Sequence, residues 1–261
     1  MVMKARLRHI FGSRQAAEQP REPTPKSSTR WRSPDPELAN SRMDHLDPVL
    51  VAALNEDRIQ TIAKCVGPGL WVVPIFTEPA CTRLTAVINH RLQWQKAQPQ
   101  ESPNSMHYAG VVFEPMGLAP VMNRLRETIV EPFRSKLYTE FDALDEDYAF
   151  AATYGRGLDH RLGFHVDDSE VTLNVSLGAE HTGGELTFLG RRCPLHRQDH
   201  HRPEEEVRVT IPKGHGLLHT GSHRHLVNSV MGERRNLILW CRSNEHRARQ
   251  DDSSCPAWCG H

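Results

Sequence analysis

No charge of either sign dominates this 261-residue sequence, in which 32 lysines and arginines are balanced by 32 aspartates and glutamates. A neutral balance gives no signal for nucleic acid or an acidic membrane as a partner. Long apolar runs are also lacking, because no stretch approaches the roughly 20 apolar residues that span a bilayer. The six cysteines are scattered and follow no secretory signal, which favours reduced thiols. We therefore expect a soluble intracellular protein, cytoplasmic or nuclear.

Hydrophobic residues are also few, at 38% of the chain. That content fits one folded region diluted by a polar segment. Residues 1–45 are the candidate segment, since basic residues exceed acidic ones in its first part and Pro and Ser are frequent after Gln19. We interpret residues 1–45 as a disordered basic arm. Its first stretch is mildly amphipathic, so organelle targeting stays open.

Apolar residues at helical spacing mark the next part of the chain. The stretch DPVLVAALNEDRIQTIAK opens at Asp47, and Thr77 is placed to cap a helix over PACTRLTAVINHRLQWQK. Between them, GLWVVPIF is typical of a buried strand. A further helix is predicted over roughly 119–137, where Pro132 should kink or split it. Residues 46–145 are therefore predicted to be a helical lead-in that packs on the core.

Short strand-like runs replace the helical pattern from Tyr148 onwards. Turns rich in Gly, Pro and His separate the runs YAFAATY, VTLNVSLG, ELTFLG, VRVTI, HGLLHT and RNLILWC. Regular short strands are typical of a sandwich or barrel, and a jelly roll closes such strands without long exposed edges. We predict an α+β fold, with a double-stranded β-helix (jelly roll) over 146–245 and N-terminal helices that buttress an outer face.

Two polar segments interrupt or follow the predicted strands. Residues 190–206 read as a long loop, whose His196, His200 and His201 are interpreted as solvated. Residues 246–261 form a polar tail with Cys255, Cys259 and His261, which could contribute zinc ligands. Their spacing and a missing fourth ligand favour an ordinary thiol-bearing terminus instead.

A metal site is indicated by His165-Val166-Asp167, just before the run EVTLNVSLG. On an extended backbone residues i and i+2 point to the same side, so the imidazole and the carboxylate can reach one ion. Two imidazoles and one carboxylate leave coordination positions free, as an iron(II) oxygenase requires. The motif alone is weak evidence in a chain with 16 histidines, and a third ligand must come from elsewhere.

The C-terminal half supplies a third histidine and an arginine. His225 lies 60 residues after His165, and nine residues later Arg234 opens an apolar run. Strand alternation places Arg234 on one face with Ile238 and Trp240. An arginine that points into a barrel needs an anionic partner, because burying a lone guanidinium is very costly. The distal carboxylate of a diacid would serve, bound through two parallel hydrogen bonds.

Several motifs together resemble a known family. The series is Tyr154 followed by GxxxxxLGFHVDDSEVTLNVSLG, then TGGELTF, then LLHTGSHRHLVNSVMGERRNLILWCRS. It is similar to the prolyl and lysyl hydroxylase branch of the iron(II)- and 2-oxoglutarate-dependent oxygenases. Within that branch it most resembles the group called 2-oxoglutarate and iron-dependent oxygenase domain-containing protein 2 and its plant relatives. The resemblance covers about residues 103–245 and is faint before residue 100.

This resemblance implies a set of roles. It implies iron ligation by His165, Asp167 and His225, and binding of the 2-oxoglutarate C5 carboxylate by Arg234. Asn174 matches a lysyl hydroxylase-like position near the cosubstrate, and Tyr154 matches a pocket tyrosine. Where many prolyl hydroxylases carry a second pocket tyrosine, this chain has Ser176. A strand Asn or Tyr can instead satisfy neighbouring backbone groups.

Rival residues stand close to these candidates. His219 and His223 compete with His225, but the nine-residue spacing to Arg234 fits His225 better. Arg235 competes with Arg234 yet falls on the opposite strand face, and Asp168 competes with Asp167 on the same ground.

We therefore predict an iron(II)- and 2-oxoglutarate-dependent dioxygenase that hydroxylates a C–H bond, with a prolyl or lysyl side chain of a protein or peptide as the leading substrate. Dioxygen is the co-substrate, succinate and CO2 are products, and L-ascorbate is expected to assist. A small-molecule or nucleic-acid hydroxylase or demethylase is the alternative enzyme. An inactive jelly roll that binds a ligand or partner is the alternative from another class.

Overall fold

The computed structural model describes residues 31–40, 45–96, 102–104, 106, 107, 109–155, 157–178, 180–251 and 253–261. Most of the predicted basic arm, residues 1–30 and 41–44, lies outside these ranges. Within the arm, Pro36–Asn40 form a 3-10 helix and Leu38 is buried. Arg83 donates two hydrogen bonds to the Asp35 carboxylate, at 2.7 and 2.8 Å. Packed structure therefore begins before Asp47, although the helical spacing predicts that ordered structure starts at that residue.

The predicted helices form with the expected caps. Asp47 caps α1 (Pro48–Asn55) through a hydrogen bond from the Val49 amide, and Thr77 caps α2 (Glu78–Gln95). The helical pattern after α1 breaks at Asp57, which has a φ of 48°. Positive φ is unfavourable inside a right-handed helix, so the chain continues only as a 3-10 turn, Ile59–Thr61.

The predicted helix over roughly 119–137 is divided into three parts. They are α3 (Ala119–Leu125), a π-helical turn (Arg126–Val130) and α4 (Glu131–Leu137). Pro132 lies in the first turn of α4, directly after the π-helical turn. Proline has no N–H to donate to the preceding turn, and the wider π-helical turn accommodates that loss. The expected interruption is thus present without separating the two helices.

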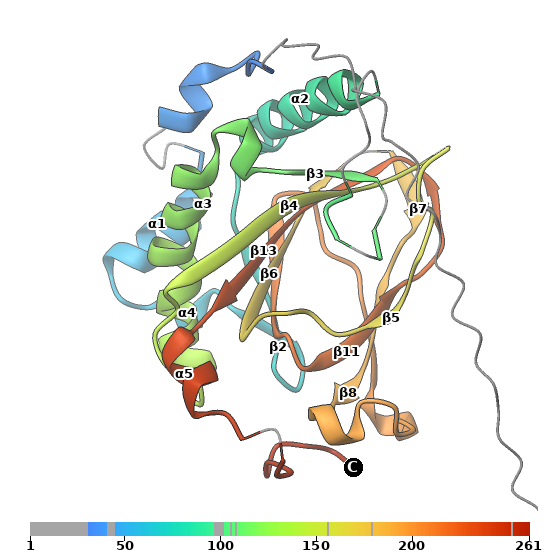
Figure 1. The fold of residues 1–261 in the computed structure, drawn as a ribbon. Helices are drawn as coiled ribbons and strands as arrows, with labels where there is room; N and C mark the ends of the chain where they lie inside the picture. The colour runs from blue at the N-terminus through green and yellow to red at the C-terminus, as the bar shows by residue number, and fades with distance from the viewer. Residues whose placement is uncertain are drawn as a thin grey trace, which may run out of the picture. The chain divides into compact units, whose positions relative to one another are not determined.

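Two antiparallel sheets face each other, and the helices lie on the outer side of the larger one (Figure 1). The larger sheet has the order β1-β2-β10-β6-β13-β4-β3. Its strands are β1 (Lys64–Gly67), β2 (Leu70–Pro74), β10 (His215–Thr220), β6 (Val171–Gly178), β13 (Arg234–Arg242), β4 (Glu146–Tyr154) and β3 (Gly110–Val112). The predicted α+β jelly roll with N-terminal helices on an outer face is therefore confirmed.

The smaller sheet has the order β5-β11-β8-β9, and a two-stranded sheet pairs β12 with β7. Their bounds are β5 (Leu162–His165), β11 (His223–Val227), β8 (Leu186–Arg191), β9 (Glu206–Val209), β12 (Val230–Gly232) and β7 (His181–Gly183). The sequence did not predict the short strands β5, β7, β11 and β12, because they have only three to five residues, too few for alternation to show. A terminal helix, α5 (Asn244–Arg249), follows β13.

Strand alternation divides the interior into two cores. On β13, Leu237 and Leu239 pack with the helices, whereas Ile238 packs between the two sheets. On β6 the outer face is apolar, while the inner face carries Asn174 and Ser176. Side chains of neighbouring residues on a strand point to opposite faces, so each central strand serves both cores. The space between the sheets is the more polar of the two.

No helix in the described part of the chain is long and apolar enough to cross a membrane.

The predicted long loop after β8 contains two 3-10 turns, Pro194–His196 and Pro203–Glu205. Arg192, whose side chain is nearly inaccessible, donates to both carboxylate oxygens of Glu205 at 2.8 and 2.7 Å. The Arg202 amide donates to the same carboxylate. These bonds, with the one to Arg192 first, lower the pKa of Glu205 to about 2.

Replacing Leu237 with alanine should lower the free energy of unfolding by about 3 kcal/mol, because Leu237 is fully buried and its loss leaves a cavity. Chemical denaturation measures the change. Met231→Ala is the matched control, since Met231 is 73% exposed, and it should change stability by less than ~0.5 kcal/mol. Equal effects of the two substitutions would contradict this division into core and surface.

Glu205→Gln should remove one acid-sensitive contribution to stability. The folded-state pKa of Glu205, about 2, lies below that of an unfolded glutamate, so its contribution is complete above about pH 4.3 and is lost as the pH falls towards 2. We expect ~2 kcal/mol, measured as the wild-type minus mutant difference in unfolding free energy across that window. A difference that does not change with pH would refute the assignment.

Candidate functional site

Two histidines 60 residues apart are brought together by the pairing of β5 with β11. The antiparallel register places His165 directly opposite His225. Their ring centroids lie 4.1 Å apart. Neither β5 nor β11 carries a strong strand pattern, so this pairing depends on the rest of the sheet rather than on local propensity.

Asp167 follows β5 and completes the cluster. Its amide donates to the Gly221 carbonyl at 3.0 Å, and the Thr172 hydroxyl donates to its Oδ2 at 2.7 Å. A side chain at residue 221 could not fit, because an added Cβ would lie 1.9 Å from the Ser169 carbonyl oxygen. Asp167 Oδ1 then stands 3.7 Å from His165 Nε2 and 3.8 Å from His225 Nε2. These three residues form a group of donor atoms suited to one metal ion.

The imidazoles are oriented for ligation. His165 Nδ1 lies 2.8 Å from the Gly163 carbonyl oxygen, and His225 Nδ1 lies 2.9 Å from the His223 carbonyl oxygen. A carbonyl can only accept, so Nδ1 carries the proton and the Nε2 lone pair is free for a cation. Burial, followed by the nearby His225, lowers the pKa of His165 to about 4, and burial also lowers that of His225. Both rings are therefore neutral near pH 7.

The aspartate is ionised. Burial acts to raise the pKa of Asp167, but the neighbouring His225, His219 and His165 and the Thr172 hydroxyl outweigh it and lower that pKa. One carboxylate and two neutral imidazoles is the donor set of non-haem iron(II) sites. The residues present therefore fit such an ion.

The rival residues lie elsewhere or serve other contacts. His219 is fully buried with its Nε2 3.7 Å from Asp167 Oδ2, yet it lies outside the group of three donors. His223 packs its ring against Phe188, with centroids 5.0 Å apart. Asp168 pairs at the surface with Arg242 and Arg247, at 2.8 and 2.9 Å.

A cavity of about 290 Å³ opens beside the three donors. Both pocket residues expected from the sequence, Tyr154 and Asn174, line it. Asn174 accepts a hydrogen bond from Asn236 at 2.6 Å across the neighbouring strand. Phe150, Leu186, Val227, Ile238 and Trp240 supply apolar walls. The walls of the cavity are thus apolar on most sides and polar near the three donors.

The two adjacent arginines of β13 differ in their partners. Arg235 points towards the helices, where it donates to Asn89 and Glu233. Arg234 is also buried, but its Nη1 has no hydrogen-bond partner among the described residues. Its guanidinium lies 5.4 Å from the centre of the Tyr154 ring. Burial lowers the pKa of Arg234, and burial raises that of Tyr154 to about 12, so no phenolate neutralises the arginine near pH 7.

Three contributors to the site had not been singled out from the sequence. Thr172 and Gly221 position Asp167, and His107 lines the cavity, where its ring meets Tyr154 edge-on at 5.0 Å. His107 lies within residues 46–145, the predicted helical lead-in. A lone histidine, threonine or glycine carries no distinguishing pattern, so nothing local could have marked them.

A second and wider cavity, of about 570 Å³, adjoins the first. Val166, Asp167 and Asp168 line both cavities. Its other walls come from the loop after β8, from α5 and from the C-terminal tail. Residues 166–168 therefore form a wall that the two cavities share, and we call the wider cavity the vestibule.

Comparison with known proteins agrees with this geometry. Residues 32–143 match the OGFOD2-like domain family. The chain is 36% identical over 199 residues to the 2-oxoglutarate and iron-dependent oxygenase domain-containing protein ICU11 of Arabidopsis thaliana, covering 74% of this chain and 50% of that protein. It is 35% identical over 207 residues to human 2-oxoglutarate and iron-dependent oxygenase domain-containing protein 2, covering 77% and 55%. The resemblance read from the motifs is confirmed, but its expected extent is wrong, because the family match begins at residue 32, in the part where the resemblance was expected to be faint.

The fold is also similar to that of a solved structure with much lower sequence identity. A prolyl hydroxylase from Trichoplax adhaerens, solved in complex with a hypoxia inducible factor peptide fragment, superposes with a TM-score of 0.51 at 13% identity. The match covers 80% of this chain and 99% of that one. The chain itself spans about half the length of the curated relatives it matches.

Proposed function

We propose that this chain, a homologue of the 2-oxoglutarate and iron-dependent oxygenases, hydroxylates a C–H bond of a prolyl or lysyl side chain in a protein or peptide. Dioxygen and 2-oxoglutarate would be consumed, and succinate and CO2 released. The observation that carries the proposal is the combination of three ligating side chains with a buried arginine whose Nη1 lacks a partner among the described residues. A binding module would need neither feature.

His165, Asp167 and His225 would hold the iron. Bound there, iron(II) with 2-oxoglutarate would supply the activation of dioxygen needed for C–H hydroxylation. The chain's own residues set the geometry: the Gly163 and His223 carbonyls fix the two rings, and Thr172 fixes the carboxylate. Such supporting hydrogen bonds commonly change metal affinity by 10-fold to 100-fold.

Arg234 would bind the far carboxylate of 2-oxoglutarate. A bidentate pair with a carboxylate satisfies the free nitrogen and compensates the charge of a guanidinium that is buried beside Tyr154. Asn174 and Tyr154, on the walls of the cavity beside the three proposed iron ligands, would contact the cosubstrate. The apolar walls exclude water, which strengthens each of these polar contacts.

A peptide would enter through the wider cavity. That cavity adjoins the donor cluster at residues 166–168 and is large enough to take an extended segment whose side chain reaches Asp167. The net charge of zero gives no sign of a nucleic acid as the substrate. We further expect L-ascorbate to sustain turnover.

The test is product formation. Chain reconstituted with iron(II) and 2-oxoglutarate is incubated with pools of prolyl- and lysyl-containing peptides, and mass spectrometry detects the gain of one oxygen atom together with succinate. His165→Ala should abolish both. Oxygen gain only in small molecules or oligonucleotides would shift the substrate class. Absence of succinate, together with no visible band when 2-oxoglutarate is added to the iron-loaded chain without oxygen, would support a binding protein.

Arg234→Ala should raise the 2-oxoglutarate concentration needed for half-maximal binding by about 100-fold or more, because a buried charge-assisted pair costs several kcal/mol to break. Anaerobic titration of the visible band measures the change. Iron affinity should be nearly unchanged, and Arg234→Lys should recover part of the loss. Arg208→Ala, at an exposed site on β9, is the matched control. Unaltered 2-oxoglutarate affinity in Arg234→Ala would refute this role.

A further inference from the structure

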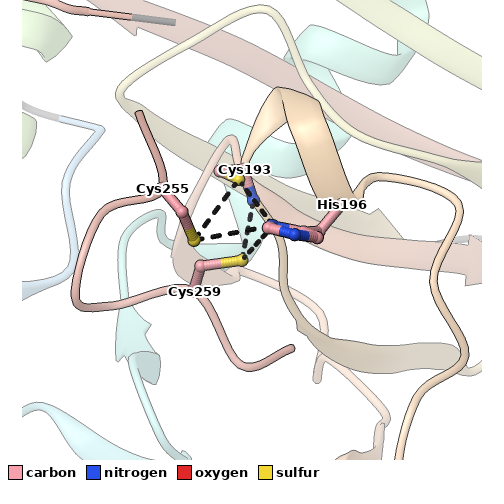
Figure 2. Close-up of side chains that lie close together, drawn as sticks. All are labelled: Cys193, His196, Cys255 and Cys259. Atoms are coloured by element: carbon pink, nitrogen blue, oxygen red, sulfur yellow. Dashed lines mark hydrogen bonds between the residues drawn. The ribbon is translucent and has the colours of Figure 1, made fainter. Parts of the chain in front are cut away.

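A second group of metal-binding side chains lies away from the iron ligands. Cys193 and His196 come from the loop after β8, while Cys255 and Cys259 come from the C-terminal tail (Figure 2). The tail returns beneath the barrel to the 3-10 turns of that loop, so segments about sixty residues apart meet (Figure 1). One ligand atom from each residue lies within 4.8 Å of all the others.

The separations are those of a tetrahedral site. His196 Nδ1 lies 3.2 Å from Cys193 Sγ, 3.5 Å from Cys255 Sγ and 3.6 Å from Cys259 Sγ. The sulfurs of Cys193 and Cys255 are 3.9 Å apart. Zn–S bonds of about 2.3 Å and a Zn–N bond of about 2.0–2.1 Å, at tetrahedral angles, require about 3.6 Å between nitrogen and sulfur and about 3.8 Å between sulfurs. The four donors therefore already surround a space of the right size.

A disulfide does not explain the cluster. All six cysteines are free, and a sulfur–sulfur distance of 3.9 Å is nearly twice the bond length of about 2.05 Å. The spacing along the chain also suits a metal, because two residues separate Cys193 from His196 and three separate Cys255 from Cys259. Zinc ligands commonly occur in pairs with two to four residues between them.

The backbone supports the cluster independently of its ligands. The Cys193 amide donates to Cys259 Sγ at 3.3 Å, an N–H···S contact that stabilises a thiolate. The Gly260 amide donates to the Arg191 carbonyl at 3.2 Å. Residue 260 lies close to the ion pair, since an added Cβ would lie 2.7 Å from Glu205 Oε1 and 2.8 Å from Arg192 Nη1. The ion pair of Arg192 with Glu205 thus buttresses both halves of the cluster.

The aromatic ring of Trp258 fastens the tail as well. The Arg191 guanidinium lies 4.5 Å from the centre of that ring. His261 stacks on His196, with ring centroids 3.9 Å apart and planes 5° from parallel. The His261 ring thus covers the proposed ligand, and its Nδ1 lies 3.3 Å from Cys255 Sγ, but it lies outside the group of four donors.

We propose that Cys193, His196, Cys255 and Cys259 bind one Zn²⁺ ion in a closed structural site. Four protein ligands leave no position for water or substrate, which distinguishes this site from the open iron site. The ion would join the loop after β8 to the tail through four metal–ligand bonds. The hydrogen bonds and ring contacts of the tail could not replace these bonds.

The location gives this site a consequence for the wide cavity. Pro194 of the loop and Ser254, Pro256 and Trp258 of the tail line the cavity that reaches Asp167. Zinc would hold these residues as one wall of the vestibule in which we place the peptide. The zinc site itself does not depend on the proposed hydroxylase activity, because its ligands take no part in the iron site.

The first test is metal content. The full chain is expressed as a His165→Ala variant, so that zinc in the iron site cannot be counted, and is purified in a reducing buffer without chelators. Elemental analysis should find one zinc per chain. Cys259→Ser and His196→Ala in that background should bring the zinc content close to zero. Cys65→Ser, which removes an exposed thiol elsewhere, and His261→Ala should leave it unchanged.

A second test does not depend on the folding of any cysteine variant. Cobalt(II) exchanged into the same zinc-bound chain should give the intense visible absorption of tetrahedral cobalt bound to thiolates. Zinc removal by a chelator should expose the chain after Arg249 to protease, and added Zn²⁺ should restore protection. Chain without zinc, cobalt spectra without thiolate bands, iron in place of zinc, or a disulfide found by mass spectrometry under non-reducing conditions would each overturn the proposal.

Discussion

The site depends on the antiparallel register between β5 and β11. That register sets His165 against His225, and the backbone bond from Asp167 to Gly221 holds the carboxylate between them. A shift of one residue would turn the two imidazoles to opposite faces of the sheet. On its other side β11 pairs with β8 in the smaller sheet, and that pairing opposes such a shift. The geometry of the three candidate ligands thus rests on strand pairing between distant segments.

The two arginines that begin β13 are both buried, but they differ in their hydrogen-bond partners. Arg235 lies on the helix side and meets its hydrogen-bonding needs with Asn89 and Glu233. Arg234 lies on the side of the cavity with one nitrogen unpaired by any described residue. An unpaired buried charge is costly, so its retention is best understood through a ligand that arrives with the opposite charge. The same argument supports a carboxylate at the end of the cosubstrate that would meet Arg234.

The two proposed metal sites illustrate different uses of the same chemistry. The iron donors are oxygen and nitrogen atoms with room left beside them, which suits a reaction centre. The zinc donors are mostly sulfur and number four, which suits a structural link. The loop after β8 and the tail then form one wall of the vestibule between them. The proposed zinc would therefore hold part of the wall of a cavity that Asp167 also lines.

The sequence by itself determined the helix caps at Asp47 and Thr77, the long alternating strands and the order of the iron-binding motifs, because these signals depend on neighbouring residues and spacing. It did not determine β5 or β11, whose sequences of four and five residues form strands only beside partners. It also left the cysteine tail without a complete ligand set, since Cys193 and His196 lie about sixty residues earlier. Only tertiary structure decided these features, because contacts between distant segments leave no periodic trace along the chain.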